Sequence, residues 1–391
     1  MEQTWRWFGP GDSVTLADAR QAGATGIVTA LHDLPPGAIW PVSAIQNRQR
    51  AVEAAGLKWS VVESVNVSED IKKRTGRYKD HIDAYRTTLR NLAACGIYTV
   101  CYNFMPVLDW LRTDLEWVLP DGAISLRFDA LALAAFDLFL LKRPAAEADW
   151  TDTQQANAYK LLQHLSEADR ERLSRTVLAG LPGTTETYSL DYVRDAIASY
   201  SDIGESGLRA NLGEFLRAVC PTAEEVGVRL CIHPDDPPRP LLGLPRIASK
   251  MEDFQFLLAQ SPERSNGITF CSGSLGARKE NDLPDILRRV ASRIYFVHLR
   301  STKYDSGYDA FHEAPHLAGD VNIVALAKEL VTEQRQRSAN GDPIQIPFRS
   351  DHGNKILTDI GRHSVPGYPA VGRLKGLAEL RGVFAAIEAL T

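Results

Sequence analysis

Hydrophobic and polar positions follow two different patterns along this chain. Short runs rich in β-branched and aromatic residues, typical of buried strands, recur between longer segments whose apolar residues repeat at helical spacing. Eight runs are predicted as strands: residues 4–8, 25–30, 58–62, 97–103, 228–232, 267–270, 293–297 and 344–348. Helical spacing predicts helices between most of them, at 16–22, 42–55, 80–94, 214–225, 250–258, 283–291 and 323–336.

A strand followed by a helix, repeated eight times, predicts an α/β fold whose parallel strands close into a (β/α)8 TIM barrel. The predicted strands are apolar almost throughout, as expected when both faces of the sheet are covered. No G-x-G-x-x-G motif follows the first strand, which disfavours an open dinucleotide-binding sheet. We therefore expect residues 1–391 to form a single TIM-barrel domain.

One long interruption follows the fourth predicted strand. Residues 109–206 show no clear strand, but helical spacing is present at 129–142, 153–165 and 190–200. This predicts a helical insertion within the barrel domain. Loops at the carboxyl ends of barrel strands carry active sites, so we expect the insertion to roof the site or to contact another subunit of a homo-oligomer.

Composition and charge narrow the possible functions. The chain is 44% hydrophobic and 24% charged, which is typical of a globular protein with a large core. A formal charge of −5 gives no overall positive field for a nucleic acid. The start of the chain lacks the pattern of a signal peptide, and no apolar run is long enough to span a membrane. We expect a cytoplasmic protein whose partner is neither a nucleic acid nor a membrane.

Four residues of types that bind metal ions stand at the ends of four consecutive predicted strands: His233, Cys271, His298 and Asp351. Each alone is more often structural, but neighbouring strand ends in a barrel converge on one mouth. Two imidazoles, a thiolate and a carboxylate from distant segments suit a catalytic ion rather than a structural zinc. The mixed ligand set favours Mn²⁺, Fe²⁺ or Co²⁺, with Zn²⁺ as the alternative.

Residues suited to acid–base chemistry lie near these positions. His352 follows Asp351 directly, and an imidazole beside a cation titrates in the range where general acid–base catalysis is efficient. The Pro- and Gly-containing loop at 365–373 could bring Tyr368 and Arg373 over the mouth, although such loops are often ordinary surface.

Positively charged residues after the late strands suit an anionic substrate. Arg300, Arg349 and Arg373 are candidates, because a guanidinium group can bind both oxygens of a carboxylate. Asp235 could orient a ligand or bind a sugar hydroxyl, and a role in a turn is equally compatible with its Asp-Asp-Pro-Pro context.

Several longer motifs resemble those of bacterial mannonate dehydratases of hexuronate (glucuronate) catabolism. They are CIHPDDPP at 231–238, FCSGSLG at 270–276, FVHLR at 296–300, HLAGD at 316–320, FRSDHG at 348–353, RWFGP at 6–10 and GIVTAL at 26–31. The resemblance spans nearly the whole chain. One difference is that Ser350 replaces a usual proline and Asn354 closes the motif, which leaves loop rigidity and substrate preference open.

The resemblance implies a xylose-isomerase-like TIM barrel that binds Mn²⁺ or a related ion. Matched by motif, the family's metal ligands fall on the four strand-end residues named above, and its acid–base residues fall on His352 and Tyr368. The implied reaction removes water from D-mannonate to give 2-dehydro-3-deoxy-D-gluconate. Removal of the proton on carbon 2 builds an enediolate, whose charge the ion and Arg349 could stabilise. Which residue takes a proton and which gives one stays open.

Three other functions are compatible with parts of this pattern. A sugar isomerase or epimerase on the same barrel would also use a divalent ion, but its product keeps the elements of water. A metal-dependent phosphodiesterase would need more ligands and a basic groove, which one ligand cluster and a charge of −5 disfavour. A sugar-acid binding module would bind substrate without turnover.

Overall fold

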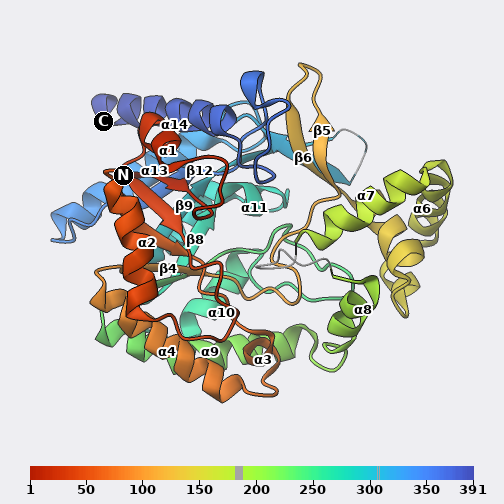
Figure 1. Ribbon diagram of the computed structural model, residues 1–391, viewed down its shortest axis with the longest axis horizontal. Helices are drawn as coiled ribbons and strands as arrows, with labels where there is room; N and C mark the ends of the chain where they lie inside the picture. The colour runs from red at the N-terminus through yellow and green to blue at the C-terminus, as the bar shows by residue number, and fades with distance from the viewer. Residues whose placement is uncertain (181–187, 306, 308) are drawn as a thin grey trace.

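Eight parallel strands close into a barrel in the order β1-β12-β9-β8-β7-β4-β3-β2 (Figure 1). This computed structural model describes residues 1–180, 188–305, 307 and 309–391. The barrel strands are β1 (Glu2–Arg6), β2 (Gly26–Thr29), β3 (Lys58–Glu63), β4 (Thr99–Tyr102), β7 (Arg229–Ile232), β8 (Asn266–Cys271), β9 (Ile294–Leu299) and β12 (Pro347–Ser350). The predicted TIM barrel is confirmed, and its strand ends lie within a few residues of the predicted ones.

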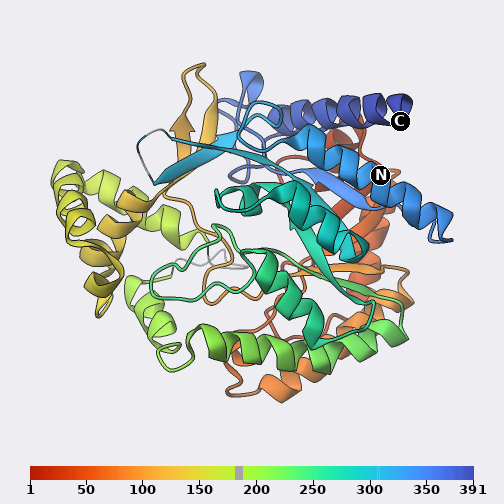
Figure 2. The same cartoon turned by 180° about the vertical axis from the view of Figure 1, so that it is seen from behind.

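Helices surround the barrel and bury one face against it (Figures 1 and 2). The helices of this layer are α1 (Leu16–Gln21), α2 (Val42–Ala54), α4 (Tyr78–Ala94), α9 (Gly204–Glu225), α10 (Met251–Gln260), α12 (Leu283–Val290), α13 (Ile323–Ala339) and α14 (Ala370–Leu390). In α12, Leu283, Ile286, Leu287 and Val290 are buried, which is the spacing of one helical face. Two shorter helices, α3 (Glu69–Lys73) and α11 (Ser272–Gly276), follow β3 and β8.

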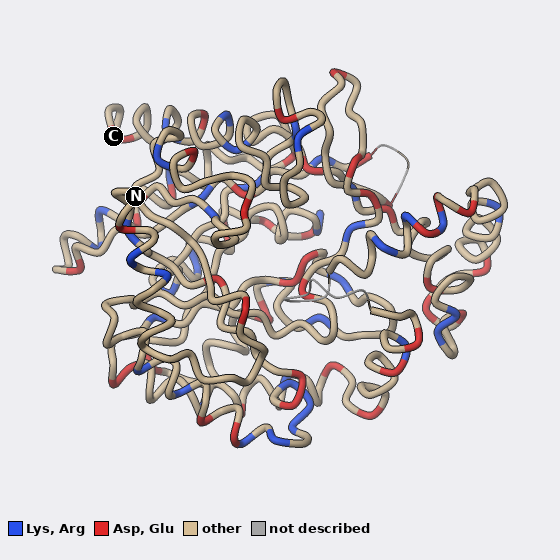
Figure 3. The backbone as a smooth tube through the Cα atoms, viewed as in Figure 1, with Lys and Arg blue, Asp and Glu red and all other residues tan. Residues whose placement is uncertain are grey.

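Basic and acidic positions are interspersed along the outer helices (Figure 3). Some of them form pairs three residues apart on one helix, such as Arg86 with Asp83 at 3.0 Å. Such exposed pairs contribute little to stability, so the helices are held mainly by their buried apolar faces. In the described part of the chain, no helix is both long and apolar enough to cross a membrane.

The segment between β4 and β7 differs from the prediction. It contains helices α5 (Ala130–Ala135), α6 (Asp152–His164), α7 (Glu167–Leu178) and α8 (Leu190–Ala198), with a π-helical turn at Phe136–Leu141 and a short 3-10 turn at Ala146–Asp149. It also contains β5 (Asp114–Val118) and β6 (Ile124–Asp129), so the expectation of no strand here is wrong. Residues of β5 are only partly buried or exposed, which leaves a weak hydrophobic signal.

Strands β5 and β6 belong to a second, antiparallel sheet of order β10-β11-β6-β5. Its other two strands, β10 (Ser301–Tyr304) and β11 (Ala310–Ala314), follow β9 of the barrel and were not predicted. This sheet therefore joins the segment after the fourth barrel strand to the segment after the seventh. The assignment of residues 109–206 as an insertion within a single domain stays a prediction.

Candidate active site

The carboxyl ends of the barrel strands place the candidate chemical residues at one mouth. Cys271 on β8 pairs in register with His298 on β9, and His298 pairs with Arg349 on β12. Residues paired in register lie at the same height, so their side chains reach the same layer. A cleft of about 820 Å³ opens here, lined by His233, Asp236, Arg300, Arg349, Asp351, His352 and Tyr368 from the late strands and by Arg6, His32 and Glu63 from the early ones.

The structure brings together the four strand-end residues considered as metal ligands. One ligand atom each from His233, Cys271 and His298 lie within 4.8 Å of one another. Nε2 of His233 lies 3.1 Å from Nδ1 of His298. Oδ2 of Asp351 lies 3.7 Å from that Nδ1 and 3.9 Å from Sγ of Cys271.

These distances fit a single metal ion. Ligands at roughly 2.0–2.3 Å from one ion lie about 3–4.6 Å from each other, a range that contains the separations of 3.1, 3.7 and 3.9 Å. Nδ1 of His233 lies 2.7 Å from the carbonyl oxygen of Pro234, so the ring donates there and offers its Nε2 lone pair to the cluster. Burial lowers the pKa of His233, which favours the neutral, ligating form of the ring.

Charged partners hold the carboxylate of this cluster ionised. Burial alone would raise the pKa of Asp351, but Arg349 and the neighbouring histidines outweigh it and keep the pKa well below its ordinary value. Nη1 of Arg349 donates to Oδ1 of Asp351, and its Nη2 lies 3.0 Å from Oε1 of Glu63. Arg349 therefore has carboxylates on both sides at the edge of the cluster.

Glu63, the last residue of β3, was missed in the sequence analysis. Its Oε1 lies 3.6 Å from Nε2 of His298 and its Oε2 lies 3.3 Å from Nη1 of Arg6. A carboxylate at the end of a predicted strand satisfies the same criterion that selected His233 and Asp351. The signal was therefore present in the sequence.

His352 and Tyr368 both lie beside Asp351 in the cleft. Nε2 of His352 is 3.8 Å from Oδ1 of Asp351, and Nδ1 is 3.3 Å from Oε1 of Glu313. The Tyr368 hydroxyl donates to Oδ1 of Asp351 at 3.2 Å. The rings of His352 and Tyr368 meet edge to face, with their centres 5.1 Å apart. The proposed acid–base pair thus shares one carboxylate.

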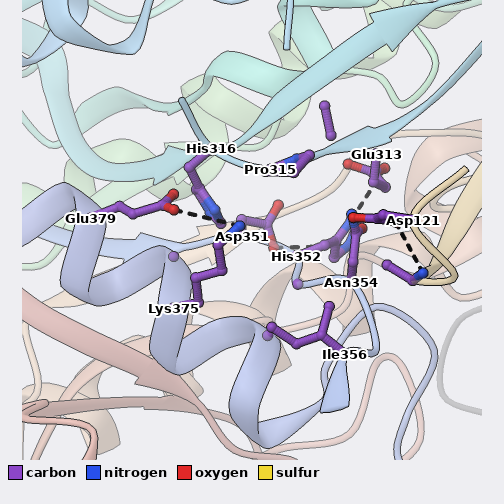
Figure 4. Close-up of a pocket in the computed structure, with 15 residues that line it drawn as sticks. Asp121, Glu313, Pro315, His316, Asp351, His352, Asn354, Ile356, Lys375 and Glu379 are labelled. Carbon is purple, nitrogen blue, oxygen red and sulfur yellow. Dashed lines mark hydrogen bonds and ion pairs between the residues drawn. The ribbon is translucent and has the colours of Figure 1, made fainter. Parts of the chain in front are cut away.

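A second, smaller cavity of about 40 Å³ lies behind His352 (Figure 4). His352 contacts Glu313 and Asp351 there, and His316 extends from the opposite wall toward Asp351. Burial lowers the pKa of His316 to about 4, so this ring is neutral at ordinary pH. This cavity separates His352 from Lys375 and Glu379 on α14, which form an ion pair at 3.5 Å.

Arg300 lies in the cleft wall but is already paired. Its Nη1 donates to Oδ2 of Asp236 at 2.7 Å, and its Nε lies 2.8 Å from Oε2 of Glu313. Arg112, from the segment after β4, contacts the same two carboxylates at 2.8 Å each. The four side chains form a buried network, which the sequence analysis missed because Glu313 lies on an unpredicted strand.

Two residues considered for substrate binding lie away from the cleft. Arg373 is in the first turn of α14, not in a loop over the mouth, so that expectation is wrong. Its guanidinium group stacks on Trp5 at 3.9 Å and donates to the carbonyl oxygen of Arg6 at 2.7 Å. Asp235 accepts hydrogen bonds from the backbone of Ala248 and the hydroxyl of Ser249. Of the Asp-Asp pair, the second residue lines the cleft.

Comparison with known proteins gives a consistent result. A family model of D-mannonate dehydratase (UxuA) matches residues 1–391. The mannonate dehydratase of Chromohalobacter salexigens is 58% identical over 390 residues, covering 100% of both chains. The crystal structure of mannonate dehydratase from Streptococcus suis serotype 2 superposes with a TM-score of 0.78 at 33% identity, over 100% of this chain and 94% of that one. A D-allulose 3-epimerase from Methylomonas sp. shares only the fold, with a TM-score of 0.51 at 11% identity over 98% of both chains. The chain therefore belongs to the D-mannonate dehydratase family.

Proposed function

We propose that this protein is a metal-dependent lyase that removes water from D-mannonate to give 2-dehydro-3-deoxy-D-gluconate, a step of hexuronate catabolism. The observation that carries this proposal is the four-donor cluster, with His352 and Tyr368 on one of its carboxylates, in the cleft of a chain that belongs to this family. Membership of the family supports the substrate and the reaction.

We propose that His233, Cys271, His298 and Asp351 hold Mn²⁺, with Fe²⁺ or Co²⁺ as alternatives. Soft sulfur and hard oxygen together suit an ion that accepts more ligands than tetrahedral Zn²⁺. When bound, the ion would stabilise negative charge on a substrate oxygen as a Lewis acid. Arg349, fixed between Asp351 and Glu63, would add a second positive charge at the same edge.

His352 is assigned as the base and Tyr368 as the acid. The Tyr368 hydroxyl donates to Asp351, which requires the phenol to carry its proton. Oε1 of Glu313 lies 3.3 Å from Nδ1 of His352, and because a carboxylate can only accept, a proton on Nδ1 would suit this contact and leave a lone pair on Nε2. Hydrogen positions follow here from the acceptors that surround each group.

The bonds and protons balance over one turnover. Nε2 of His352 takes the proton on carbon 2, and the electron pair of that bond forms the carbon 2–carbon 3 double bond as the carbon 3 hydroxyl leaves. The Tyr368 proton joins the leaving hydroxyl to form water. The enol then becomes the 2-keto acid by moving its hydroxyl proton to carbon 3, and the His352 proton replaces the one that Tyr368 lost.

The charges of the cleft favour an anionic substrate. Arg6 and Arg349 balance Glu63 and Asp351, and the network of Arg112 and Arg300 balances its own two carboxylates. At the candidate metal site itself, a divalent ion with the Cys271 thiolate would leave one positive charge over, while Arg48, Asp33 and Asp109 line the wider cleft. From the sequence, we also propose that the protein is cytoplasmic and forms a homo-oligomer. Light scattering would measure the oligomeric state.

The test is turnover of a panel of hexonates by thiol-protected protein supplied with Mn²⁺. We expect a 2-keto acid from D-mannonate, detected with semicarbazide, and mass spectrometry should show the loss of one water. An isomer of unchanged mass would instead identify a sugar-acid isomerase or epimerase. Absence of any product from every hexonate would contradict the proposed activity.

A variant test addresses the acid–base assignment. His352→Asn should lower kcat by about 10²–10⁴-fold while metal content stays at the parent value, because general acid–base catalysis contributes that factor. His164→Asn, on the exposed end of α6, is the matched control and should leave kcat unchanged. A His352→Asn variant within tenfold of the parent would show that the imidazole is not the base.

A further inference from the structure

We propose that Arg6, at the carboxyl end of β1, binds the substrate carboxylate through the unpaired side of its guanidinium group. This inference rests on the proposed function, because it takes a sugar acid as the ligand. It assigns the carboxylate to a residue from the first strand of the barrel, which pairs with the strand that carries Arg349.

The other arginines of the mouth already contact groups of the protein, although Nε and Nη2 of Arg300 and Nε of Arg349 also lack a hydrogen-bond partner among the described residues. Arg300 and Arg349 each contact two carboxylates, and Arg373 is stacked behind the cleft wall. Arg48 lines the cleft, but its Nη1 donates to the carbonyl oxygen of Ala30 at 2.9 Å. At Arg300 and Arg349, a substrate carboxylate would have to displace a carboxylate of the protein that already contacts the guanidinium group.

Arg6 differs because only one side of its guanidinium group is used. Nη1 donates to the carbonyl oxygen of Glu63 and lies 3.3 Å from its Oε2. Among the described residues, buried Nε has no hydrogen-bond partner, and Nη2 has only a 3.4 Å contact with Nε2 of His32. The N–H groups of Nε and Nη2 are parallel, which is the pair that binds the two oxygens of a carboxylate.

Neighbouring side chains hold this guanidinium group in place. Arg6 lies over the ring of Phe8 at 4.8 Å, and Phe8 meets Tyr368 edge to face at 4.9 Å. Burial, with the charges of Arg6 and Arg48, lowers the pKa of His32 to about 3, so that ring is neutral. A neutral ring can accept from Nη2 without repelling it, and it carries no charge that competes for the carboxylate.

The position also fits the order of atoms in an aldonate. Carbon 1 carries the carboxylate and carbon 2 carries the proton that leaves, so the two must be adjacent in the site. Glu63 contacts both Arg6 and Arg349, and Phe8 packs between Arg6 and Tyr368. Arg6 therefore lies next to the groups assigned to proton transfer, not at the far end of the cleft.

The test compares two ligands that differ only in the carboxylate. Calorimetry in the His352→Asn background, in which turnover is slowed, measures Kd for D-mannonate and for neutral D-mannitol. Arg6→Gln should weaken D-mannonate binding by about 10- to 150-fold, the range for losing hydrogen bonds to a charged group. D-mannitol binding should change less than twofold. Arg6→Lys keeps the charge without the paired N–H groups and should fall between.

Controls separate binding from folding. Arg86 also donates to a backbone carbonyl and pairs with a carboxylate, but on the outer helix α4, so Arg86→Gln should bind both ligands as the parent does. Added methylguanidinium should restore part of the D-mannonate affinity of Arg6→Ala, which a purely structural defect would not allow. These two results would support a direct contact with the carboxylate.

Two outcomes would overturn the inference. Equal weakening of both ligands would show that Arg6 supports the fold or contacts hydroxyls, and unchanged D-mannonate binding would show no contact. The proposed function fails separately: in that case the parent protein dehydrates no hexonate. A parent that dehydrates D-mannonate, with an Arg6→Gln variant that binds it normally, would refute this inference alone.

Discussion

Replacement of Asp236 by Asn tests whether the buried network at the barrel mouth is a major source of stability. Asp236 accepts hydrogen bonds from Nη1 and Nη2 of Arg112 at 2.8 and 3.1 Å, and from Nη1 of Arg300 at 2.7 Å. Its pKa is lowered because the two arginines outweigh the effect of burial. The amide has nearly the same volume, so the substitution removes the charge without leaving a cavity.

The size of the effect follows from the burial of these groups. Arg112 is 0% exposed and Arg300 is 1% exposed, so neither guanidinium group can turn to water when the carboxylate is lost. Breaking a buried pair by removing one partner costs about 3–5 kcal/mol. Glu313 still contacts both arginines, which places the expected loss near the lower value. At about 2.1 cal/mol/K per residue, 391 residues convert a loss near the lower value to a fall of roughly 4 °C in Tm.

Differential scanning calorimetry of Asp236→Asn, with a second scan to establish reversibility, measures this loss. Glu214→Gln is the control, because Glu214 pairs with Arg217 at 2.8 Å while both side chains are about half exposed. An exposed pair is worth about 0–1 kcal/mol, so the control should melt within about 1 °C of the parent. An Asp236→Asn protein that also melts within 1 °C would refute the reasoning from burial.

Three further results are expected. Gly376→Ala should lower Tm, because a Cβ there would lie 2.2 Å from Cε1 of His316. The control Gly382→Ala lies on the same helix, where a Cβ meets nothing within 4 Å, and should add about 1 kcal/mol of stability. Equal changes in Tm for the two variants would contradict the predicted clash with His316. Arg300, His352 and Arg112 outweigh burial and lower the pKa of Glu313 to about 2. The ionised Glu313 carboxylate therefore contributes about 3 kcal/mol to the free energy of unfolding above pH 5, and this contribution is lost as the pH falls toward 2. Urea titrations at several pH values should show that the stability of Glu313→Gln falls less with acid than that of the parent. The same dependence of stability on pH in both proteins would disprove this prediction. A chelator should abolish turnover and lower Tm, and added Mn²⁺ should restore both, because an ion that binds only the folded state stabilises it. Full activity of the chelated, metal-free protein would exclude the proposed metal dependence.

The barrel and the meeting of four strand-end side chains could be predicted because closure leaves little freedom. Once eight parallel strands close, residues at consecutive strand ends face one mouth, whatever the connecting segments do. The register of Cys271 with His298 follows from this closure. Glu63 was accessible to the same argument, since it directly follows the predicted strand at 58–62.

Other features of the site depend on pairings between distant segments. The sequence shows that Arg300 is positive, but not that Asp236 and Glu313 occupy its donors. That contact requires the pairing of β10 with β11, two short strands that include polar side chains and whose burial does not alternate along the strand. Asp235 and Asp236 differ by one position, and only the backbone path after β7 decides which carboxylate enters the cleft.

The antiparallel sheet of order β10-β11-β6-β5 limits which segments can be exchanged between this chain and its relatives. β6 and β11 pair in register from Arg127 with His312 to Asp129 with Ala310, so β5 and β6 form one hydrogen-bonded unit with β10 and β11, built from two stretches of chain. Arg112, two residues before β5, also forms an ion pair with Glu313 on β11. A chimera that grafts either stretch alone would leave unsatisfied backbone groups along an edge strand, and a functional transplant of specificity must carry both.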